Sequence, residues 1–64
     1  MKPETQKEYI DIAVNEWMRY AEMFPTSKLS ITYLRTKGFS WEDIAQMYID
    51  AIETNQEIDL VKRR

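Results

Sequence analysis

Residues 5–24 read TQKEYIDIAVNEWMRYAEMF, and this stretch decides the fold. Its apolar side chains recur every three or four residues, the spacing that gathers them on one side of an α-helix. Thr5 with Glu8 fits a capping box at the start, and Pro25 prevents simple continuation beyond the end. The predicted core face of this helix comprises Ile10, Ala13, Val14, Trp17, Ala21 and Phe24.

A second helix is predicted over residues 27–37, although Leu29 to Tyr33 alternates apolar and polar residues as a half-buried strand does. Helix is preferred because the run has no hairpin signal beside it and Gly38 follows it as a helix-ending glycine would. A third helix is predicted over residues 40–54, since Ser40 is a strong N-cap residue and Phe39 can pack against Ile44. Its predicted buried face comprises Trp41, Ile44, Ala45, Tyr48 and Ile52.

The sequence therefore predicts one all-α domain of three helices, about 5–24, 27–37 and 40–54, with a short C-terminal extension. Asn55 suits the left-handed conformation that ends many helices. For residues 56–64 the sequence leaves two alternatives, a short fourth helix or a frayed end.

Composition excludes several classes of function. The 64-residue chain has no Cys and no His, so it lacks the thiolate nucleophile, the usual base near neutral pH and the commonest transition-metal ligands. We therefore expect no enzymatic activity, no metal or other cofactor and no small-molecule substrate. The sequence has no apolar run of the ~18 residues that a membrane span needs, and its first residues do not read as a signal peptide. A cytoplasmic protein without a membrane partner is expected.

The first predicted helix is too apolar for an isolated molecule. Its polar side chains occupy an arc of only about 80°, and a second apolar stripe adjoins the predicted core face. The stripe is either buried by compact packing or exposed for a partner, and its aromatic and Met side chains favour a partner. The predicted protein-binding residues of this helix are Tyr9, Ile12, Glu16, Tyr20 and Met23. We expect a regulator, adaptor or inhibitor that binds a larger protein and forms a homodimer, because so small a domain needs a supplement to its core.

Charges are segregated along the chain. Residues 39–54 contain four acids and no base, and Glu42, Asp50 and Glu53 form an acidic stripe that is either an ordinary solvated face or a second protein-binding surface. Residues 25–38 contain three bases and no acid.

The alternative function is a dimeric DNA-binding regulator of helix-turn-helix type, but acids on the expected recognition helix would be repelled by phosphates. Its candidate nucleic-acid contacts are Lys28, Arg35, Lys37, Lys62, Arg63 and Arg64.

Overall fold

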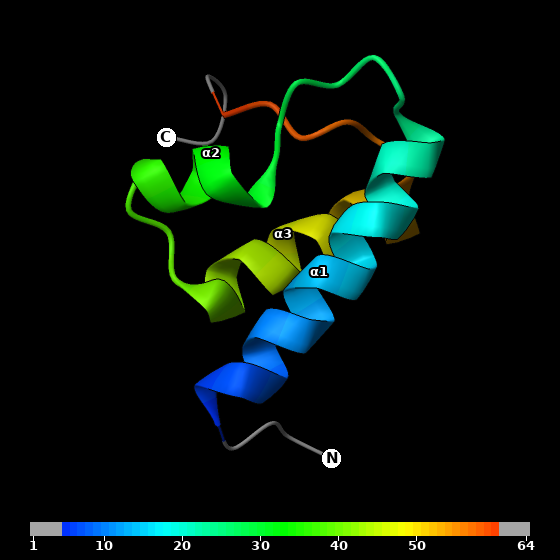
Figure 1. Ribbon diagram of the computed structural model, residues 1–64. Helices are drawn as coiled ribbons and strands as arrows, with labels where there is room; N and C mark the ends of the chain where they lie inside the picture. The colour runs from blue at the N-terminus through cyan, green and yellow to red at the C-terminus, as the bar shows by residue number, and fades with distance from the viewer. Residues whose placement is uncertain (1–4, 61–64) are drawn as a thin grey trace.

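The computed structural model describes residues 5–60, and within them the chain forms three α-helices and no β-strand. Helix α1 spans Gln6–Met23, α2 spans Ile31–Thr36 and α3 spans Trp41–Thr54. The two long helices cross, with α3 behind α1 and the short α2 to the left (Figure 1). The predicted all-α, three-helix domain is confirmed. None of these described helices has the length and apolar character needed to cross a membrane.

The residues predicted to cap the helices take the expected positions at both kinds of helix end. Thr5 Oγ1 accepts the backbone N–H of Glu8 at 3.2 Å, and Ser40 Oγ accepts the N–H of Asp43 at 3.1 Å. Each bond satisfies a donor that the first turn of a helix leaves without an intrahelical partner. Gly38 adopts φ +96° just after α2, a conformation that suits glycine because it has no side chain to clash. Asn55 takes the left-handed conformation after α3, as predicted.

Helix α2 begins later than predicted, at Ile31 rather than residue 27. Ser30 is its N-cap, since its side-chain oxygen accepts the N–H of Tyr33 at 3.2 Å. Ser27 has a different role: its Oγ accepts the N–H of Leu29 at 3.3 Å and is hydrogen-bonded to Tyr20 Oη at 3.1 Å. A serine that bonds to the backbone two residues ahead holds a turn, so residues 27–29 stay outside the helix.

The core lies where α1 and α3 cross. Tyr20 is completely buried there, with its ring centroid 5.0 Å from those of both Phe24 and Tyr48. The predicted buried face of α3 is confirmed, with Trp41 and Ile52 only partly buried at its edges. The fully or almost fully buried apolar residues are Ala13, Tyr20, Leu34, Ile44, Ala45, Met47, Tyr48 and Ala51.

Helix α1 buries only part of the predicted face: Ala13 is buried and Trp17 and Phe24 pack against the core, as predicted. Val14 is 36% exposed and Ala21 is exposed, although both were assigned to the core, whereas Tyr20 is 0% exposed although it was assigned to an exposed stripe. The prediction that Tyr20 is exposed is therefore wrong. The physical reason is that α3 packs across the boundary between the two apolar stripes, so Ala13 of one and Tyr20 of the other are both buried, while Val14 and Ala21 turn outward.

The described part of the C-terminal extension is neither a fourth helix nor a frayed end. Residues 56–60 are non-helical and run back from the end of α3 towards α2 (Figure 1). Ile58 and Leu60 pack against the buried cluster, and the backbone N–H of Ile58 donates to Tyr20 Oη at 3.3 Å. One phenol therefore links α1, the loop before α2 and the C-terminal segment.

Candidate protein-binding groove between α1 and α3

A groove of about 390 Å³ lies between α1 and α3. We call it the α1–α3 groove. Ile12, Ala45 and Ile49 give it an apolar lining, and its two carboxylates, Glu42 and Asp43, come from the first turn of α3. The acids therefore stand at one end, and Ile49 lies further along the helix. The full lining comprises Tyr9, Ile12, Glu42, Asp43, Ala45, Gln46 and Ile49.

Tyr9 and Glu42 join the two helices at the acidic end of the groove. The Tyr9 hydroxyl donates a hydrogen bond to Glu42 Oε1 at 3.1 Å. This bond, with smaller contributions from partial desolvation and from the negative charges of Glu42 and Glu8, raises the pKa of the Tyr9 phenol above its ordinary value. Tyr9 is therefore a protonated donor at neutral pH. The carboxylate that it contacts keeps further acceptor positions, because an ionised carboxylate can accept about four hydrogen bonds.

The other residues of α1 that were predicted to bind a protein do not form one surface. Glu16 lies 3.1 Å from Arg19 Nη1 in an ion pair within the helix, and its side chain is only 16% exposed. Met23 is 37% exposed at the end of α1, and Tyr20 belongs to the core. Of the five residues expected to form one surface, Tyr9 and Ile12 therefore line the groove, together with an acid from the other predicted surface, Glu42.

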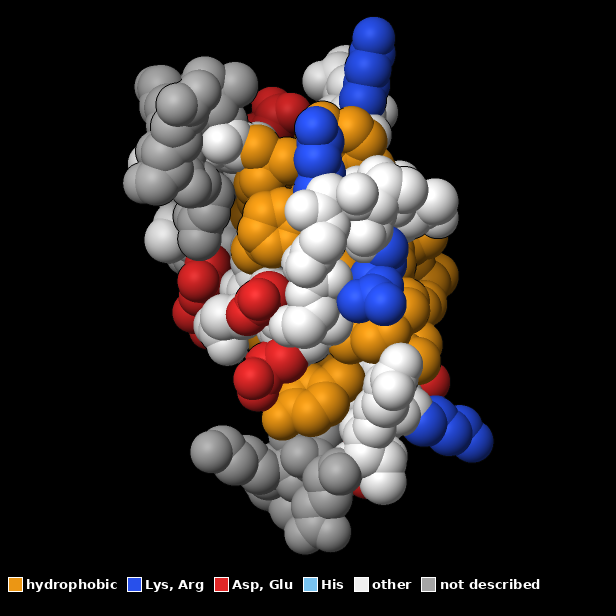
Figure 2. Space-filling view, turned by 90° about the vertical axis from the view of Figure 1, so that its left-hand side faces the viewer, with side chains coloured by type: hydrophobic (Ala, Val, Ile, Leu, Met, Phe, Trp, Pro, Cys, Tyr) orange, Lys and Arg blue, Asp and Glu red, His pale blue; other side chains and the backbone are white. Residues whose placement is uncertain are grey.

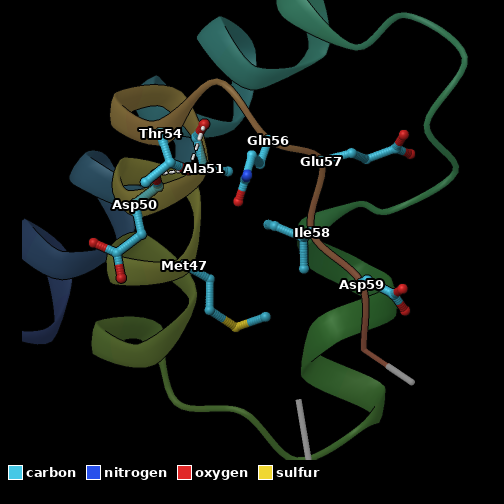
Figure 3. A pocket seen from close by; sticks show the side chains of 8 residues that line it. All are labelled: Met47, Asp50, Ala51, Thr54, Gln56, Glu57, Ile58 and Asp59. Carbon is cyan, nitrogen blue, oxygen red and sulfur yellow. Dashed lines mark hydrogen bonds between the residues drawn. The ribbon is translucent and has the colours of Figure 1, made fainter. Parts of the chain in front are cut away.

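The acidic residues of α3 also separate. Asp50 lines a second hollow, between α3 and the C-terminal segment, and Glu53 is exposed on α3. Figure 3 shows that Met47 and Ile58 point into this hollow, whereas the carboxylates of Asp50, Glu57 and Asp59 point away from it. Asp50 Oδ1 also accepts a hydrogen bond from Gln46 Nε2 at 2.9 Å. These acids do not converge, and residues 5–60 contain no group of three or more potential ligands arranged to hold a metal ion.

The basic residues named for DNA binding are partly engaged with aromatic rings. The Arg35 guanidinium lies 4.9 Å from the centroid of the Trp41 ring and donates to the Phe39 carbonyl oxygen at 2.9 Å. The Lys37 ammonium lies 5.4 Å from the centroid of the Tyr33 ring. Figure 2 shows acidic side chains mostly at the left of one face and basic side chains at the right and top, with apolar side chains between. Lys28 is exposed in the loop before α2, and Lys62, Arg63 and Arg64 lie outside the described residues.

Sequence reasoning missed a second apolar surface, on the outward side of α1. We call it the outer stripe and define it as Ile10, Val14, Met18 and Ala21. Met18 is 55% exposed and Val14 is 36% exposed. The stripe was visible in the sequence as an apolar face, but three of its four members had been assigned to the core.

The arrangement as a whole suits binding. The α1–α3 groove offers apolar contacts beside carboxylate acceptors, and the single phenol proton of Tyr9 is already donated to Glu42. No protein-family model, curated protein or solved structure matches the chain.

Proposed function

We propose that the protein is a non-catalytic interaction domain that regulates, adapts or inhibits a larger protein. A basic, amphipathic helix of that protein occupies the α1–α3 groove. The observation that carries the proposal is the combination, in one groove, of an apolar lining with acids at one end.

The apolar lining provides the contact area. Ile12 on α1 and Ile49 on α3 are half-buried, and Ala45, one turn before Ile49 on α3, is 4% exposed. An apolar side chain inserted between two such walls loses its contact with water, which is the main favourable term in association. Tyr9 adds an aromatic ring, a side-chain type enriched where proteins bind one another.

Charge specifies the kind of partner. Glu42 and Asp43 are both exposed at one end of the groove, and α3 carries four acids and no base. A partner helix with Lys or Arg beside its apolar stripe would place positive charges against these carboxylates. An acidic helix would be repelled.

The proposal is tested with two labelled model helices of 18 residues, one built from Leu and Lys and the other from Leu and Glu. Fluorescence anisotropy should show that the Leu/Lys helix binds, that salt weakens this binding, and that the Leu/Glu helix does not bind. Ile49→Glu should weaken binding of the Leu/Lys helix at least tenfold, because it places a charge against the apolar part of the ligand. Met18→Glu is the matched control, since Met18 lies on the other side of α1.

Equal binding of the two model helices would refute the proposed charge selection. Unchanged binding by the Ile49→Glu variant, or an equal loss in the Met18→Glu variant, would show that the α1–α3 groove is not the site.

A further inference from the structure

The outer stripe is an apolar surface that the proposed function does not use. Its members are spaced by four, four and three residues, so they follow one line along α1. On the helix they lie roughly opposite Tyr9 and Ile12, which face the α1–α3 groove. Met18, with 55% of its surface exposed, stands on this outward side. Helix α1 therefore presents apolar side chains on two separate sides.

The size of the chain gives a reason for the outer stripe to be covered. A domain of this length buries a smaller fraction of its surface than larger ones do, and such domains commonly gain stability from a disulfide, a metal or another subunit. The sequence has no cysteine, and residues 5–60 show no metal-binding group. Association through exposed Val14 and Met18 would add buried apolar surface without changing the existing core.

We propose that the outer stripe binds a second copy of this chain, with the two α1 helices antiparallel. Charge complementarity identifies the occupant. Lys7 and Glu22 are exposed at opposite ends of α1, about 22 Å apart along its axis; Lys7 continues the line of the stripe before Ile10, and Glu22 lies at its edge beside Ala21. When two such helices pack antiparallel around a two-fold axis near Val14, Lys7 of each copy faces Glu22 of the other.

A parallel arrangement would instead gather the two Lys7 side chains at one end of the interface and the two Glu22 side chains at the other, so it would form neither ion pair. The antiparallel arrangement also brings helix ends of opposite partial charge side by side. Both comparisons favour the antiparallel pair of identical chains.

The length of α1 sets the expected strength. Its 18 residues span about 27 Å, and a contact made mainly by one helix from each copy falls at the small end of interface sizes, below about 1,200 Å². Interfaces of that size belong to weak complexes, and we expect a dissociation constant on the order of micromolar. The two grooves of the dimer stay open, because they lie on the other side of each α1.

Sedimentation equilibrium of the full chain from about 1 µM to 1 mM tests the proposal directly. The unmodified protein should convert from monomer to dimer across this range, and Met18→Glu should weaken association at least tenfold. Lys7→Glu and Glu22→Lys should each weaken it severalfold, and the double variant should recover the original affinity because it restores the opposite charges. Circular dichroism checks that each variant is folded.

Ile49→Glu is the control, since it alters the α1–α3 groove and should leave the dimer intact. A protein that remains monomeric at 1 mM, or a Met18→Glu variant that dimerises normally, would refute self-association through the outer stripe. Failure of the folded double variant to recover affinity would refute the antiparallel arrangement. Because the two surfaces are tested by different variants, loss of this proposal would leave the proposed groove function unaffected.

Discussion

Two buried tyrosines provide a paired test of how the core is stabilised. Tyr20 and Tyr48 are both 0% exposed, and their ring centroids lie 5.0 Å apart. Tyr20 Oη is hydrogen-bonded to Ser27 Oγ and to the N–H of Ile58. Tyr48 Oη has no hydrogen-bond partner among residues 5–60. The same substitution, Tyr to Phe, therefore removes a linking hydroxyl at one position and an unpaired hydroxyl at the other.

The two substitutions should change the free energy of unfolding in opposite directions. Tyr20→Phe loses two hydrogen bonds worth about 1 kcal/mol each and leaves their partners unsatisfied, so it should lower stability by about 2 kcal/mol. Tyr48→Phe removes a group whose burial without a partner costs about 1–3 kcal/mol, so it should raise stability by about 1 kcal/mol. The free energies of unfolding of the two variants should differ by about 3 kcal/mol, although each variant lacks only one hydroxyl oxygen of the unmodified protein.

Urea unfolding followed by circular dichroism measures this difference. The transition midpoint should fall in Tyr20→Phe and rise in Tyr48→Phe, with unchanged slopes, because neither substitution alters the surface that unfolding exposes. If Tyr48→Phe destabilised the protein as much as Tyr20→Phe, the assignment of one satisfied and one unsatisfied hydroxyl would be wrong.

Three further predictions concern helix ends and ionisation. Ser40→Ala should lower the free energy of unfolding by about 1 kcal/mol, because it removes the acceptor for the Asp43 N–H. Thermal unfolding followed by circular dichroism measures this loss, and Ser40→Asp should retain most of the stability in the same experiment. Burial raises the pKa of Tyr48, so above pH ~10 the unfolded chain releases a proton that the folded chain keeps. The free energy of unfolding, measured with urea, should therefore fall as the pH rises above this value, and it should fall less in Tyr48→Phe. Glu42→Gln should lower the pKa of Tyr9 towards its ordinary value in an ultraviolet titration, and an unchanged titration would contradict the Tyr9–Glu42 contact.

Local signals in the sequence were sufficient to predict most of the helix ends. Ser40 and Gly38 act through hydrogen bonds and backbone conformation within a few residues, so their effects are readable without knowing the fold. The start of α2 was missed because two serines compete for the N-cap position. Ser30 is the N-cap, while Ser27 is hydrogen-bonded to Tyr20. That bond joins the loop to α1 and depends on the tertiary fold, so it could not be predicted from the local sequence.

The rotation of α1 and the composition of the groove depend on tertiary packing. The buried face of α1 takes Ala13 from one apolar stripe and Tyr20 from the other, and only the packing against α3 makes that choice. The sequence indicated Tyr9 and Glu42 as members of two separate surfaces. Only the crossing of α1 over α3 makes them neighbours in one groove.

The central claim, that the α1–α3 groove binds a basic amphipathic helix, is tested most directly by nuclear magnetic resonance. Addition of the Leu/Lys helix to the ¹⁵N-labelled protein should shift the backbone amide signals of Tyr9, Ile12, Ala45 and Ile49, which face the groove. The signal of Met18, on the other side of α1, should move little. Shifts centred on Met18, or no shifts at all at millimolar ligand, would contradict the claim.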